Sequence, residues 1–156
     1  MSMTAAGISS ALALALALAL GLGVLVASAA TPARAAPDIA GDWLTPEGAV
    51  VRIEACGGAP CGRLVRFRPP PGLTMETTRD ANNRDASKRA RKVLGLTVLW
   101  QLAPAGDIWR GRTYDPRRGF SAVATLTAAD RGRLTVRGCV RVLVELCESE
   151  TWTRLR

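Results

Sequence analysis

The chain has 156 residues and no His, with 21 Lys and Arg against 13 Asp and Glu. Without His, the sequence excludes Ser-His and Cys-His nucleophile pairs, an imidazole general base and the His-ligated sites of common zinc and iron enzymes. We therefore expect a protein that is not an enzyme and that uses no cofactor and no metal ion. The net charge of +8 favours an anionic partner such as a membrane surface, although the even spread of the arginines is also typical of a compositional bias.

The first 35 residues are predicted to be a signal peptide. Residues 8–30 carry no charge, residues 11–20 alternate strictly between Ala and Leu, and Ala33 and Ala35 form a small-residue cleavage site. Cleavage after Ala35 leaves one domain over residues 36–156, exported to the periplasm, with a net charge of +7 because only Arg34 is lost. Residues 1–10 hold no Lys or Arg, so an uncleaved membrane anchor is the alternative. We expect an exported monomer that does not bind nucleic acid, since aromatic residues make up only 4% of the chain.

From residue 41 onward, short apolar runs alternate with turn signals rich in Pro, Asp and Gly. Val51 and Ile53 alternate with Arg52 and Glu54, and the same period of two recurs over 65–68 and 134–137, as in strands with one buried face. The sequence therefore predicts an all-β fold, a small antiparallel up-and-down β-barrel of about eight strands, with a β-sandwich as the alternative. The expected strands lie near 41–45, 49–55, 62–68, 94–102, 107–114, 119–127, 133–139 and 147–155.

The first expected strand begins with Gly41, Asp42 and Trp43. Gly41 lets the backbone bend where the strand enters the barrel, and Trp43 is suited to plug a closed end. This pattern resembles the G-x-W of the lipocalin-like superfamily, in which an Arg late in the chain lies across the Trp. The resemblance implies that Arg154 makes a cation–π contact with Trp43.

The four cysteines predict two local disulfides. Cys56 and Cys61 flank a Gly-Gly-Ala-Pro turn, and Cys139 and Cys147 flank a seven-residue stretch that is largely apolar. Export to an oxidising compartment favours disulfides, and we expect Cys56 to pair with Cys61 and Cys139 with Cys147 among the three possible pairings. A four-Cys zinc site is the alternative, but its usual spacings are absent.

The longest connection, residues 69–92, is the first candidate for a site. Residues 79–92 hold six basic and two acidic side chains, and a short helix capped by Asp85 is expected over 86–93. At a barrel mouth these arginines could bind a phosphate or carboxylate head while an apolar tail enters the lumen. A solvated loop is the alternative, and a calcium site would lack the EF-hand spacing. The candidate ligand contacts here are Arg79, Asp80, Asn83 and Arg91.

A second candidate lies at residues 109–119, where a strand runs into a turn. Asp115 is expected to accept backbone hydrogen bonds in that turn, and it also counts as a candidate ligand contact. Arg110, Arg112 and Tyr114 share one face of the strand and form a polar ligand anchor if that face lines the lumen. If it faces outward, Trp109, Gly111 and Thr113 are the inward residues instead.

Several segments together resemble an uncharacterised bacterial family, domain of unknown function family 2147. The resemblance implies a small exported all-β domain and brings no activity. Arg84 and Lys92 stand where the family pattern leads us to expect Pro, which loosens the long connection and adds charge. The matching segments are GDWLT at 41–45, CGG at 56–58, CGRLV at 61–65, Asp80 with Asn83 and Asp85, LGL at 94–96, WRGRTYDP at 109–116 with Gly119, RGC at 137–139 and TWTR at 151–154.

These observations lead to two hypotheses about function. The first is a barrel that binds a small apolar or amphipathic ligand, such as a lipid, in an open lumen. The second is a disulfide-stabilised interaction module that meets an envelope protein or an anionic membrane surface, with its lumen filled by large side chains. The side chains that could fill it are Trp43, Phe67, Trp100, Trp109, Phe120 and Trp152.

Overall fold

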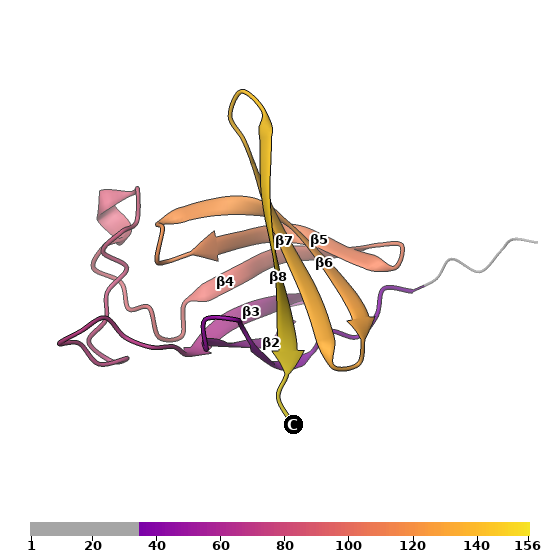
Figure 1. The fold of residues 1–156 in the computed structure, drawn as a ribbon, viewed down its shortest axis with the longest axis horizontal. Coiled ribbons are helices and arrows are strands. Elements are labelled where there is room, and N and C mark those ends of the chain that lie inside the picture. Colours follow the sequence, from indigo (N-terminus) through magenta and orange to yellow (C-terminus); the bar gives the residue numbers. More distant parts are fainter. Residues whose placement is uncertain (1–34) are drawn as a thin grey trace, which may run out of the picture. The chain divides into compact units, whose positions relative to one another are not determined.

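The computed structural model describes residues 35–156, so the predicted leader lies outside the described residues apart from Ala35. Eight antiparallel strands each pair with the next in sequence, and β8 pairs with β1 to close a barrel (Figure 1). The predicted up-and-down barrel is confirmed, and the β-sandwich alternative is wrong. The strands are β1 (Gly41–Leu44), β2 (Val50–Cys56), β3 (Ala59–Arg66), β4 (Thr97–Ala105), β5 (Ile108–Asp115), β6 (Phe120–Asp130), β7 (Arg133–Arg141) and β8 (Glu145–Arg154).

The helix expected over 86–93 is wrong in extent. Only a single 3₁₀ turn, η1 (Ala86–Lys88), forms there, with the Asp85 side chain accepting a hydrogen bond from the Ser87 backbone N–H at 3.1 Å. No residue of this turn is buried, so a longer helix would have no apolar face to pack against the barrel. The chain instead pairs Lys92 with Arg79 in an isolated β-bridge and then enters β4. Among the described residues, no helix is long and apolar enough to cross a membrane.

The alternation along each strand sorts side chains between the lumen and the outer surface. In β6, Ala122, Ala124 and Leu126 are buried, whereas Val123 between them is half exposed. Residues directly opposite each other in an antiparallel pair lie on the same face of a sheet. The register of β6 with its neighbours therefore assigns the inward residues of β5 and β7 as well.

One end of the barrel is closed by its own side chains. Trp43 is fully buried there, and its indole N–H donates to the Ile39 carbonyl at 2.9 Å. The indole N–H of Trp109 donates to the Pro37 carbonyl at 2.8 Å, so the segment before β1 is held across this end. The core continues with Leu102, Leu126 and Leu134, so within residues 35–156 the lumen is open at the opposite end.

Candidate functional site

The half of the lumen away from Trp43 contains a cavity of about 760 Å³. This volume falls within the usual range for small-molecule sites, about 300 to 1,000 Å³. The inner wall is apolar and comes from strands all around the barrel. Its side chains include Val51, Leu64, Val98, Ala122, Val136 and Trp152.

The cavity exists because small residues occupy several inward positions. Ala122 on β6 and Gly138 on β7 line it, next to Thr113 on β5. A Cβ atom added at Gly138 would lie 3.4 Å from the Thr113 methyl carbon and 3.5 Å from the Ala122 Cβ, which is ordinary van der Waals contact. The wall is therefore close-packed within itself but sends no large side chain into the lumen from these positions.

Charged side chains surround the mouth, in contrast to the apolar wall. They come from the β1–β2 turn, the connection between β3 and β4, the β5–β6 turn and strand β8. This arrangement places an apolar chamber behind a polar rim, which suits a ligand with an apolar body and a polar head. The charged residues that line the cavity are Glu47, Arg68, Arg79, Asp115, Arg117, Arg118, Glu148 and Glu150.

Two of the rim arginines are held in ion pairs across the mouth. Arg117, in the β5–β6 turn, lies 3.3 Å from a carboxylate oxygen of Glu47 and 4.0 Å from one of Glu150. Arg118 lies 2.6 Å from Glu148. These pairs connect the β5–β6 turn with the β1–β2 turn and with β8, and they are partly exposed, so each contributes about 0 to 1 kcal/mol.

Arg68 and Arg79 differ from these two arginines. Both line the cavity near its mouth and both are exposed. Within the described residues, neither lies within 4.0 Å of a carboxylate. They are the rim cations that remain free for an anionic group of a ligand.

Glu148 and Glu150 were not among the residues selected from the sequence. Glu150 lies opposite the inward-facing Val136, and its carboxylate accepts a hydrogen bond from the Trp152 indole at 3.0 Å. The period of two carries a signal for both residues. Residues 148, 150 and 152 share a face of β8 with Arg154, the residue expected to lie across Trp43.

The ligand anchor expected from Arg110, Arg112 and Tyr114 does not lie in the lumen. Arg112 is opposite the half-exposed Val123, and Thr113 is opposite the buried Ala122. Arg110 and Arg112 therefore project from the outer wall of β5, as in the alternative with Trp109, Gly111 and Thr113 inward. Tyr114, at the end of the strand, shares their face but also borders the cavity. The lumen face of this strand is formed by Trp109, Gly111 and Thr113, of which the last two leave room for the cavity.

Four of the predicted contact residues meet in one buried cluster on this outer wall. Asp80 is fully buried, and it accepts hydrogen bonds from the Tyr114 hydroxyl at 2.6 Å, the Asn83 amide at 2.7 Å and the Arg91 guanidinium at 2.8 Å. The Arg91 guanidinium also lies 5.2 Å from the centre of the Tyr114 ring. The cluster attaches the long connection to β5, and these contacts occupy the oxygens that a calcium ion would need.

Asp115 has the turn role that the sequence predicted. Its side chain accepts a hydrogen bond from the Arg117 backbone N–H at 2.9 Å, and its carbonyl accepts one from Gly119 at 2.8 Å. It also lines the cavity. Of the eight predicted contact residues, Arg79, Tyr114 and Asp115 thus line the cavity, while Arg110 and Arg112 remain on the outer wall.

The expected pairing of Arg154 with Trp43 is present at the closed end. The guanidinium carbon lies 4.4 Å from the centre of the Trp43 ring, and the side chain donates to the carbonyls of Ala40 and Arg131. Gly41 has a φ of +128°, and a Cβ there would lie 2.7 Å from an Arg154 nitrogen. Glycine is therefore required at this position by both the backbone and the space above it.

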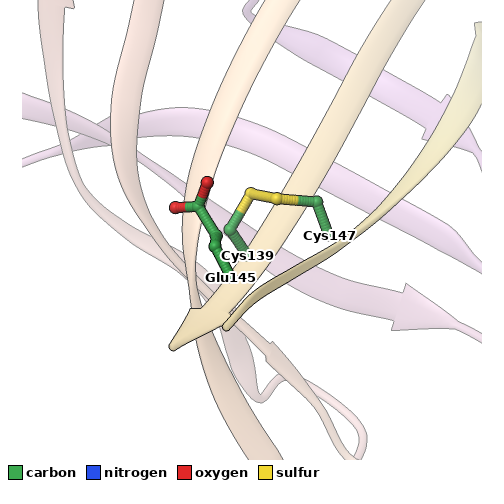
Figure 2. Close-up of side chains that lie close together, drawn as sticks. All are labelled: Cys139, Glu145 and Cys147. Carbon is green, nitrogen blue, oxygen red and sulfur yellow. A yellow bond between two sulfur atoms is a disulfide. The ribbon is translucent and has the colours of Figure 1, made fainter. Parts of the chain in front are cut away.

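Both predicted disulfides form, Cys56 with Cys61 and Cys139 with Cys147. Figure 2 shows Glu145 close to the second disulfide, and the three potential ligand atoms of Cys139, Glu145 and Cys147 lie within 4.8 Å of one another. The two sulfur atoms are bonded to each other, so they cannot act as thiolate ligands in this state. The four-Cys zinc alternative is wrong for the same reason.

The fold and the chamber define a lipocalin-like barrel. A similar solved structure is protein HP1028 from the human pathogen Helicobacter pylori, described as belonging to the lipocalin family. The TM-score is 0.64 at 17% identity, over 76% of this chain and 84% of that one. Residues 41–154 match the model of a family described as an uncharacterized protein conserved in bacteria, domain of unknown function 2147, and the chain belongs to that family. A comparison with curated proteins found no match.

Proposed function

We propose that this protein binds a small apolar or amphipathic, lipid-like molecule in its barrel lumen and performs no covalent chemistry on it. The observation that carries the proposal is the apolar cavity of about 760 Å³ behind a charged mouth. A ligand there exchanges water for apolar contacts along its body, while its polar end stays at the hydrated rim. The lipocalin-like fold supports the same class of function.

The alternative of a filled lumen is less well supported. Among the large side chains that could fill it, Trp43 and Trp109 belong to the core at the closed end, and Trp152 lines the cavity wall. Trp100 lies opposite Arg112, on the outer face of β4. Phe67 and Phe120 line the cavity, and a volume of about 760 Å³ remains between these side chains.

We also propose that the protein works outside the cytoplasm, in the periplasm. Two disulfides are typical of proteins from oxidising compartments. The predicted leader over residues 1–35 supports the same localisation.

The test compares two aromatic substitutions in neighbouring residues of β6. Ala122→Phe places a ring in the cavity, whereas Val123→Phe places the same ring on the outer wall. The probe is the fluorescent fatty acid dansylaminoundecanoic acid, titrated into protein stripped of lipid. We expect Ala122→Phe to weaken binding by about tenfold or more, equivalent to about 1.4 kcal/mol, and Val123→Phe to leave it unchanged.

Native mass spectrometry of the purified protein provides a second readout. A discrete additional mass that disappears after solvent extraction, and that is absent from Ala122→Phe, supports a lumenal ligand. The proposal fails if wild-type protein binds the probe without saturation, or if both variants bind it equally well.

A further inference from the structure

The β7–β8 hairpin ends in an exposed apolar tip. Val142, Leu143 and Val144 are 73%, 98% and 64% exposed, and they extend past the neighbouring strands of the barrel (Figure 1). Three consecutive aliphatic side chains in water are unfavourable unless something covers them. We call residues 142–144 the hairpin tip.

The hairpin that carries the tip is braced. β7 and β8 pair without interruption from Arg133 to Arg141. The disulfide between Cys139 and Cys147, shown in Figure 2, joins the two strands three residues from either end of the tip. A braced hairpin loses less conformational entropy when its end inserts into another phase. The tip is therefore presented on a stiff support.

An arginine face lies on the outer wall beside this hairpin. Arg110 on β5 is opposite Thr125 on β6, and Thr125 is opposite Arg137 on β7. Arg112 lies two residues after Arg110 and therefore on the same face of β5. None of these three arginines lies within 4.0 Å of a carboxylate in the described part of the chain. The residues opposite them in these rows are neutral, namely Trp100, Ala103, Val123, Thr125, Cys139, Cys147 and Ser149.

We propose that the hairpin tip and the arginine face together dock on an anionic lipid surface. The tip supplies aliphatic side chains for the acyl boundary, and the unpaired guanidinium groups attract the negative headgroups. Charge complementarity is what distinguishes this occupant from a second copy of the chain, because two such faces would bring six unpaired arginines together. Docking also places the cavity mouth near the lipid, since Val140 and Leu146 at the base of the tip line that cavity.

The first experiment measures co-sedimentation with lipid vesicles. Wild-type protein is mixed with phosphatidylcholine vesicles, and with vesicles in which phosphatidylglycerol replaces about a third of that lipid. Leu143→Asp removes the most exposed tip residue and adds a charge, and Leu73→Asp makes the same change at an exposed residue of the long connection. We expect wild type and Leu73→Asp to bind the anionic vesicles, and Leu143→Asp to bind about tenfold more weakly.

The second experiment tests the arginine face. A triple change of Arg110, Arg112 and Arg137 to Gln is expected to abolish the preference for anionic over neutral vesicles. A control triple with the same loss of charge replaces Arg66, Arg131 and Arg156, which lie elsewhere on the surface. The control is expected to keep the preference, and raised salt is expected to weaken binding of the wild type.

Membrane docking is refuted if the wild type does not bind anionic vesicles, or if Leu143→Asp and Leu73→Asp bind them equally well. It is also refuted if the wild type self-associates in sedimentation velocity, Leu143→Asp abolishes this self-association, and no vesicle binding is seen. Fatty-acid binding by the same samples separates this inference from the proposed function. Normal probe binding without vesicle binding refutes membrane docking alone, and the reverse result refutes only the lumenal ligand.

Discussion

Asp80 shows how one buried side chain can set the position of a long connection. Both of its carboxylate oxygens accept hydrogen bonds, one from Tyr114 and the other from Asn83 and Arg91. Removing the Tyr114 hydroxyl would leave one buried carboxylate oxygen of Asp80 unpaired, which costs about 1 to 3 kcal/mol. The polar cluster therefore favours one path of the connection over the outer wall, where few apolar side chains are available to do so.

The first prediction at this scale concerns the ionisation of Tyr114. Burial, together with the hydrogen bond and the negative charge of Asp80, raises the pKa of the Tyr114 hydroxyl to about 12, against the opposing influence of Arg91. Tyr114 is the only tyrosine in the chain. The ultraviolet absorbance of tyrosinate in the folded protein is therefore expected to titrate with a midpoint near pH 12, and in urea near pH 10.

The sign of the effect on stability follows from this shift. Because the folded-state pKa is raised, the stabilisation is complete below about pH 10 and is lost as the pH rises toward 12. Asp80→Asn is expected to bring the midpoint down toward 10 and Arg91→Gln to move it up, whereas Arg66→Gln, a distant control, leaves it unchanged. A midpoint of 10 in the folded wild type would contradict the buried hydrogen bond.

At the scale of elements, the β5–β6 turn is the second attachment point of the long connection. The Asn82 amide donates to the Arg117 carbonyl at 2.8 Å, and the Arg84 backbone N–H donates to the Gly119 carbonyl at 3.3 Å. Gly119 has a φ of +70°, and a Cβ there would lie 1.6 Å from the Asn82 carbonyl oxygen. The two segments can approach this closely only because residue 119 has no side chain.

Substitution of two turn glycines tests this attachment. Gly106 has a similar φ of +68° in the β4–β5 turn, but a Cβ there meets nothing within 4 Å. Gly106→Ala is expected to cost about 1 kcal/mol of unfolding free energy from backbone strain alone. Gly119→Ala adds a steric clash and is expected to cost about 2 kcal/mol more in urea unfolding. Equal losses in the two variants would show that the connection does not press on this turn.

Sequence patterns were sufficient for the strand count and for the two disulfides, because turn residues and local Cys spacing act over a few residues. They did not decide which face of β5 is inward. On β5, two arginines and Tyr114 alternate with Trp109, Gly111 and Thr113. The inward residues Gly111 and Thr113 are small, so the sequence shows little hydrophobic periodicity there. Their position depends on a cavity formed with β6 and β7, and the burial of Tyr114 depends on Asp80, more than thirty residues away. Such contacts are set by the closed barrel and leave no local periodicity.

At the scale of the whole molecule, the barrel separates an apolar chamber from a charged rim. Arg117 and Arg118 are paired with carboxylates at this rim, whereas Arg68 and Arg79 have no such partner in the described part of the chain. A guanidinium group binds a carboxylate or phosphate with two parallel hydrogen bonds, so an unpaired arginine beside an apolar cavity selects an anionic head. The proposed ligand class thereby becomes more specific, an amphipath whose head is negative.

Two ligands that differ only in the head group test this selectivity. Arg68→Gln combined with Arg79→Gln is expected to weaken binding of dodecanoate about tenfold, because charge-assisted hydrogen bonds are lost, and to leave binding of dodecanol unchanged. Displacement of the dansyl probe measures both affinities. A control pair, Arg131→Gln with Arg156→Gln, removes the same charge near the closed end and is expected to change neither affinity by more than about twofold, since distant surface charges are screened by salt. If the control pair weakens dodecanoate as much as the rim pair does, the selectivity comes from the net charge of the molecule and not from the two rim arginines. If the rim pair weakens both ligands equally, these side chains shape the entrance without recognising a charge.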